Sequence, residues 1–183
     1  MVRFFLGVLV AVAVAAAAGF AVMFTGAYDV AATSPHTALG RWVLGTTMEN
    51  SVARRAVGIV APARFSEEQA RLGAARYRES CVYCHGAPGQ DPADWATGIL
   101  PEPPYLPDVV GEWSDAQLFW IVKNGIKMSA MPAFGPHVSD QEIWGIVGFV
   151  KQLPSMSPEQ YQTFGEAPGQ GNTPGQPGSG QGG

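Results

Sequence analysis

The sequence predicts an all-α protein, with one membrane-spanning helix followed by a small domain of three to four helices. Three observations carry this prediction. An uncharged apolar run covers residues 4–24. Three Ser-x-x-Gln or Ser-x-x-Glu patterns, which are typical of helix N-termini, follow later in the chain. No segment shows a strong alternation of apolar and polar residues, so no strand is predicted.

The first element is the run from Phe4 to Phe24, in which every residue is apolar, Gly or Ala. At about 1.5 Å per residue, a helix of this length crosses a bilayer core of about 30 Å. The alternative is a cleaved secretory signal, because Arg3 supplies a basic start. The apolar region of a signal spans about 7 to 15 residues, and this run is longer. We therefore expect residues 1–25 to be a retained transmembrane anchor.

Residues 26–65 form a juxtamembrane segment with some helical pattern but no single clean period. The segment contains four arginines and two acidic residues, a formal charge of +2. Such a segment could lie on anionic headgroups or against a partner subunit.

The helical domain is expected at residues 66–154. Three serines each precede a Gln or Glu by three residues and predict helices at 67–80, 115–124 and 140–153; they are Ser66, Ser114 and Ser139. Gly125 and Pro154 mark the ends of the second and third helices. Gly73 either offers a place without a side chain where two helices could cross closely or is a glycine that the helix merely tolerates, at a cost of about 1 kcal/mol against Ala.

Residues 155–183 form a C-terminal extension. From about residue 165 it is rich in Gly, Gln, Pro and Ser with almost no apolar residues, so we expect a disordered tail.

Both cysteines of the chain fall in Cys81-Val82-Tyr83-Cys84-His85. This is the pattern that attaches haem, in which two thiols form thioethers with the porphyrin and the histidine ligates iron. Composition alone would produce it in about 1 in 5,000 random orders. The alternatives are a redox disulfide, which needs a flanking strand-helix-strand pattern, and structural zinc, which needs two more ligands at metal-like spacing. We therefore predict one covalently bound haem c.

Four side chains could supply the second axial ligand of the iron: Met131, Met128, His137 and His36. Met131 is favoured because Pro132 restricts it to an extended conformation, so a stiff loop can present it. Met128 could instead be a packing residue, and His36 reads as an exposed loop histidine.

These motifs resemble those of membrane-anchored class I c-type cytochromes. Residues 66–153 are similar to the cytochrome c subunits of cbb3-type oxidases, through Cys81-Val82-Tyr83-Cys84-His85-Gly86, Asn124-Gly125-Ile126-Lys127-Met128, Met131-Pro132-Ala133-Phe134-Gly135 and Trp144. The resemblance implies thioethers at Cys81 and Cys84, with His85 as the proximal ligand and Met131 as the distal ligand. It does not cover residues 25–65 or the tail.

The expected function is one-electron transfer in a respiratory chain and not catalysis, because an iron with two protein ligands has no free position for substrate. The domain would face the periplasm from the inner membrane, where thioether formation takes place. Expected partners are a quinol-oxidising complex or dehydrogenase and a terminal acceptor such as an oxidase, and no nucleic acid. Residues 66–153 carry a formal charge of −5, which favours a basic docking face on the partner.

The sequence leaves two alternatives open. The chain could be a fixed haem subunit of a larger membrane oxidoreductase, with residues 26–65 as an interface. It could also be a haem-based sensor with labile Met131 ligation, and such a protein would bind carbon monoxide when reduced.

Overall fold

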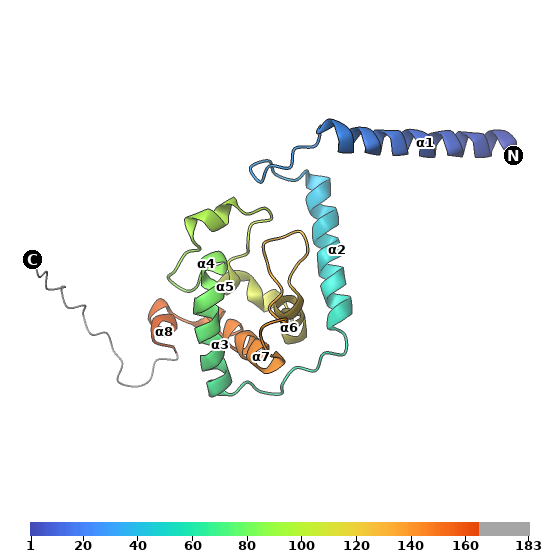
Figure 1. Cartoon of the computed structure of the whole chain (residues 1–183). Coiled ribbons are helices and arrows are strands. Elements are labelled where there is room, and N and C mark those ends of the chain that lie inside the picture. The colour runs from blue at the N-terminus through green and yellow to red at the C-terminus, as the bar shows by residue number, and fades with distance from the viewer. Residues whose placement is uncertain (165–183) are drawn as a thin grey trace, which may run out of the picture. The chain divides into compact units, whose positions relative to one another are not determined.

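The computed structural model describes residues 1–164, which form two compact units, residues 1–37 and a second unit that begins at Ala38 (Figure 1). Helices dominate these residues, and the only strand-like pairing among them is one isolated bridge between Ala87 and Gln90. The predicted all-α class is confirmed. The predicted disordered tail lies outside the described residues.

In the first unit, α1 spans Val2–Thr25 and ends at Gly26, which takes a left-handed conformation with φ 67°. Its 24 residues correspond to about 36 Å of helix, and none of its side chains is buried by the protein. This helix is long and apolar enough to cross a membrane.

Three helices of the second unit start at the predicted serines. These are α3 (Glu67–Ser80), α6 (Asp115–Asn124) and α7 (Asp140–Val150), and each has a reciprocal capping box. The third helix ends three residues earlier than the sequence predicts, because Leu153–Ser155 form the 3-10 turn η3. A fourth capping box, formed by Ser157 and Gln160, opens α8 (Pro158–Thr163).

Shorter elements connect these helices. They are α4 (Val82–His85), η1 (Asp94–Gly98), α5 (Leu106–Val109) and η2 (Val110–Glu112).

Helices α3 and α7 cross with their backbones in contact. A Cβ atom on Gly73 would overlap the carbonyl group of Gly145, and a Cβ atom on Gly145 would lie 2.7 Å from the carbonyl oxygen of Gln69. The predicted role of Gly73 is therefore confirmed. Two glycines meet because any side chain would push the helices apart.

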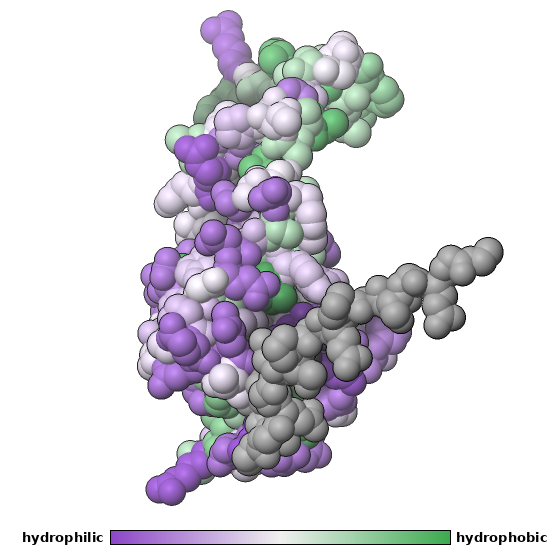
Figure 2. Space-filling model, turned by 90° about the vertical axis from the view of Figure 1, so that its left-hand side faces the viewer, coloured by the Kyte–Doolittle hydropathy of each residue, from purple (hydrophilic) through white to green (hydrophobic). Residues whose placement is uncertain are grey.

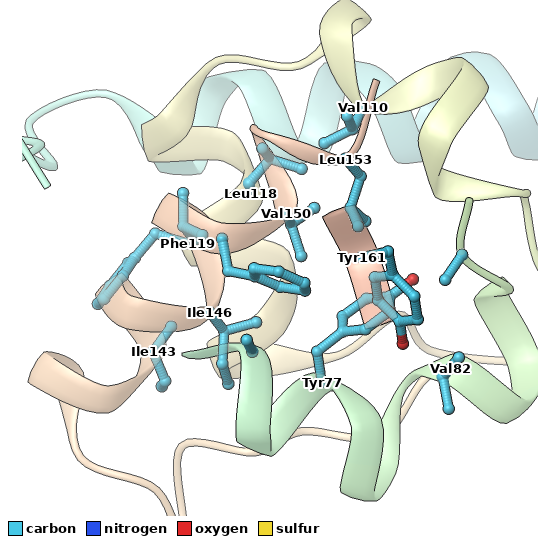
Figure 3. Packing of buried hydrophobic residues seen from close by; sticks show 14 residues of the cluster. Tyr77, Val82, Val110, Leu118, Phe119, Ile143, Ile146, Val150, Leu153 and Tyr161 are labelled. Carbon is cyan, nitrogen blue, oxygen red and sulfur yellow. The ribbon is translucent and has the colours of Figure 1, made fainter. Parts of the chain in front are cut away.

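The core lies between α3, α6, α7 and α8 (Figure 3). Tyr77 of α3 is fully buried. Its ring meets that of Phe149 edge-on, with the two ring centroids 5.5 Å apart. Tyr161 of α8 also packs on Phe149, with the two ring centroids 6.3 Å apart. The visible face of this unit in Figure 2 is mostly hydrophilic, as expected around an apolar core of this kind.

Helix α2 (Ala38–Ala56) lies within the segment that the sequence separates as juxtamembrane. It packs against α6 and buries Val52 and Ala56. Leu39, Trp42 and Val43, near its N-terminus, stay exposed. Part of residues 26–65 therefore belongs to the same compact unit as the helical domain.

Candidate haem site

The two cysteines and the histidine of the attachment motif lie on one turn of helix. Cys81 ends α3 and precedes α4, and its carbonyl oxygen accepts hydrogen bonds from the amides of Cys84 (3.1 Å) and His85 (3.0 Å). Residues three and four apart lie on one side of a helical turn. The two thiols and the imidazole can therefore all bind the same planar group.

Both thiols are free and part-buried. Burial, with a smaller contribution from Cys84, raises the pKa of Cys81 to about 12, so this thiol stays neutral at physiological pH. Residues 1–164 contain no group of three or more His, Cys, Asp or Glu side chains that could hold a metal ion.

The His85 ring is oriented by a residue that the sequence does not indicate. Its Nδ1 lies 2.9 Å from the carbonyl oxygen of Pro104, which is 19 residues further along the chain. In a neutral imidazole this Nδ1 donates to the carbonyl, and Nε2 remains available as an acceptor or metal ligand. Burial lowers the pKa of His85, which favours the neutral, ligating form.

Two tyrosines clamp the end of the motif. The Tyr77 hydroxyl donates to the carbonyl oxygen of Gly86 at 2.6 Å, and the Tyr105 hydroxyl donates to that of Ala87 at 2.7 Å. Gly86 has φ 62°, and a Cβ atom there would lie 2.5 Å from the Tyr105 ring. The motif itself indicates neither tyrosine. Tyr77 lies in the preceding helix, and Tyr105 returns to the motif through an irregular, proline-rich loop.

The four candidates for the second axial position lie in different places. Met131 is half-buried in the loop between α6 and α7, whereas Met128 of the same loop is 85% exposed. His137 is exposed near the start of α7. His36 belongs to the first compact unit. Of the four, only Met131 combines partial burial with a place in the second unit, which also contains the motif.

The donor set fits haem c. Two free thiols suit the two thioether bonds, and a neutral histidine and a thioether are axial ligands that cytochromes use. The thiols and the imidazole share one turn that neighbouring groups hold at Tyr77, Pro104 and Tyr105.

Comparison with known proteins agrees with this fit. The family described as cytochrome C oxidase, cbb3-type, subunit III, matches residues 68–150. The gluconate 2-dehydrogenase cytochrome c subunit of Pantoea cypripedii is 29% identical over 101 residues, which cover 50% of this chain. The alignment covers 22% of that relative, so the chain matches about a fifth of the relative's length. Residues 68–150 therefore form a class I c-type cytochrome domain, and the chain is an electron-transfer haem protein with covalently bound haem c.

Proposed function

We propose that this chain is a monohaem, membrane-anchored electron carrier, with thioethers at Cys81 and Cys84 and axial ligands His85 and Met131. The observation that carries the proposal is the single turn at residues 81–85, which holds two cysteines outside any disulfide and an imidazole oriented by the Pro104 carbonyl. Met131 completes the ligand set because it lies half-buried in a loop whose backbone is fixed to α6.

Haem c supplies an iron that alternates between the ferric and ferrous states by one electron. The protein's part is to hold the ligands still. The Pro104 carbonyl fixes the tautomer and ring plane of His85, and a neutral thioether from Met131 favours the ferrous state relative to a second imidazole. Two protein ligands leave no open position for a substrate, so the chain carries electrons and does not itself catalyse a reaction.

Helix α1 would remain as the anchor. Its apolar length exceeds that of a typical signal sequence, and it has no buried face that would require packing on the protein. Because thioether formation requires export, the haem domain would face the periplasm from the inner membrane.

The proposed partners are a quinol-oxidising complex or dehydrogenase as donor and a terminal acceptor such as an oxidase. The Pantoea relative is a cytochrome c subunit of a dehydrogenase, which supports the dehydrogenase option. Charge supports a basic docking face on the partner. Between Arg78 and Lys123 the chain has seven acidic residues and no lysine or arginine. Five of these acids are exposed and form no ion pair within residues 1–164; they are Asp91, Asp94, Glu102, Asp108 and Glu112.

Two of these acids, Asp91 and Asp108, influence a tyrosine that is bonded to the chain just after the attachment motif. Tyr105, whose hydroxyl bonds to Ala87, has its pKa raised by partial burial and by the carboxylates of Asp108 and Asp91. The negative charge therefore lies near the chain that follows His85. A negative surface at this place would steer basic partners towards the haem.

A second candidate function is a fixed haem subunit of a larger oxidoreductase. The exposed side chains Leu39, Trp42 and Val43 on α2 favour it, because subunit interfaces are rich in such residues. Purification in mild detergent separates the two functions. A stable complex with other subunits would favour the fixed subunit, and an isolated cytochrome would favour the carrier.

The visible spectrum of the full chain tests the ligand set. We expect a weak methionine-to-iron band near ~695 nm in the oxidised protein, lost in Met131→Ala and kept in Met128→Ala. A wild-type protein without the band, or with high-spin iron that binds carbon monoxide when reduced, would contradict Met131 ligation and favour a sensor.

A further inference from the structure

The loop that carries Met131 closes back on the end of α6. The last carbonyl groups of a helix lack partners within the helix, and here the loop supplies them. The amide of Phe134 donates to the carbonyl oxygen of Val122 at 3.1 Å, and that of Gly135 donates to Lys123 at 2.9 Å. The chain on the C-terminal side of Met131 is therefore fixed to α6.

Gly125 allows the other side of the loop to pass close to this return segment. Its φ of 67° and ψ of −176° lie in a region that is essentially restricted to glycine. A Cβ atom there would lie 2.7 Å from the carbonyl oxygen of Met131 and 2.7 Å from the amide nitrogen of Ala133. The backbone around Met131 thus packs directly on the start of the loop.

A small hydrogen-bonded ring holds Met131 itself. The amide of Ile126 donates to the carbonyl oxygen of Met131 at 3.1 Å. The Ser129 hydroxyl donates to the carbonyl oxygen of Ile126 at 2.8 Å and accepts from the amide of Met131 at 3.2 Å. The amide and the carbonyl of Met131 are therefore both hydrogen-bonded, and the bond of the amide depends on the Ser129 side chain.

The same ring directs the neighbouring methionine outwards. The amide of Ser129 donates to the carbonyl oxygen of Ile126 at 3.3 Å, which closes a turn over residues 126–129. Met128 has φ 62° in this turn, a value that non-glycine residues rarely adopt, and its side chain is 85% exposed. A turn of this kind with positive φ at its third residue is otherwise typical of glycine.

We propose that Ser129 is a positioning residue for the distal iron ligand, and that its hydroxyl bridge between Ile126 and Met131 keeps the Met131 thioether on the iron. This inference rests on the proposed role of Met131. Without the hydroxyl, the Met131 amide loses its partner and the loop can open between Gly125 and Pro132. Met131 would then detach from the iron more easily, because the iron–methionine bond would also have to hold the loop closed.

The test compares Ser129→Ala with Ser129→Thr, which keeps a hydroxyl, in the full chain purified in mild detergent. Ser155→Ala is the matched control, because the Ser155 hydroxyl also donates to a backbone carbonyl, that of Gln152, but lies in η3. The measurements are the ~695 nm band of the oxidised protein, carbon monoxide binding to the reduced protein and the midpoint potential. A net hydrogen bond of the usual strength corresponds to a change of about fivefold in the equilibrium between bound and detached methionine.

We expect Ser129→Ala to weaken the band, to bind carbon monoxide more readily by about fivefold and to lower the midpoint potential. Ser129→Thr and Ser155→Ala should resemble wild type. If Met131→Ala abolishes the band and Ser129→Ala leaves all three measurements unchanged, the positioning role is wrong and the ligand assignment stands. If Met131→Ala keeps the band, the ligand assignment fails and the positioning role fails with it.

Discussion

The hydroxyl of Tyr77 donates a 2.6 Å hydrogen bond to the carbonyl oxygen of Gly86, the residue that follows the proposed iron ligand His85. Tyr77 is fully buried in α3, so this bond joins the core of the domain to the end of the attachment motif. Burial raises the pKa of Tyr77 well above its usual value, and the hydroxyl therefore remains a donor at every physiological pH.

Tyr77→Phe should lower the free energy of unfolding by about 1 to 3 kcal/mol, because the buried Gly86 carbonyl would lose its partner. Urea unfolding followed by circular dichroism measures this change. Tyr161→Phe is the matched control. The Tyr161 hydroxyl is also buried, but it has no hydrogen-bond partner within the described residues, so its removal should cost little or stabilise the protein. Equal losses in the two variants would contradict the role of the Gly86 bond.

Gly73→Ala should destabilise the domain, by roughly 2 kcal/mol or more, because the new methyl group would meet the backbone of Gly145 where α3 and α7 cross. Gly45, in α2, provides the control, since a Cβ atom there meets nothing within 4 Å. Gly45→Ala should stabilise its helix by up to about 1 kcal/mol through propensity alone. Thermal unfolding of the two variants would show opposite shifts in Tm, and a common direction would refute the close crossing.

Glu142 should make the domain sensitive to acid. Hydrogen bonds from Ser139 and Arg76 lower its pKa below 4.5 in the folded protein. An unfolded chain therefore binds the proton at a higher pH than the folded one, and the stability due to Glu142 is lost as pH falls from about 4.5 through the lower folded value. We expect Glu142→Gln to flatten this part of the curve of unfolding free energy against pH.

The control for this measurement is Glu68→Gln, since Glu68 is exposed and forms no ion pair within residues 1–164. It should leave the acid part of the curve unchanged. The assignment would be wrong if Glu142→Gln lost stability with acid as steeply as the wild-type protein does.

The exposed acids between Arg78 and Lys123, which include Asp91 and Asp94, should govern the salt dependence of electron transfer. Reduction of the oxidised protein by cationic hexaammineruthenium(II) should slow as ionic strength rises, and oxidation of the reduced protein by anionic ferricyanide should accelerate, because salt screens attraction in one case and repulsion in the other. Stopped-flow rates measure both reactions. Asp91→Asn combined with Asp94→Asn should weaken both dependences, whereas Glu68→Gln should not. An unchanged salt slope in the double variant would place the controlling charge elsewhere.

Local sequence rules succeeded where the structure depends on neighbours in the chain. The capping serines Ser66, Ser114 and Ser139 each satisfy backbone amides three residues away, so the starts of α3, α6 and α7 could be predicted. The end of α7 was harder to predict from the sequence. Lys151 and Gln152 form turns in the structure, although neither residue type disfavours a helix. The Ser157 capping box has the same form as the other three and could have been found by the same rule.

The sequence by itself determined the helical class, the apolar span and the chemistry of the attachment motif, because each depends on the type and spacing of residues within a few turns. Only the tertiary structure showed that Pro104 orients His85, that Tyr77 and Tyr105 clamp the motif, and that Ser129 bridges Ile126 and Met131. It also placed α2 against α6. Apart from the Ser129 bridge and the Tyr77–Gly86 bond, which spans nine residues, these contacts join segments far apart in the chain, and their geometry depends on how irregular loops return. Hydrophobic periodicity and capping rules carry no information about such returns.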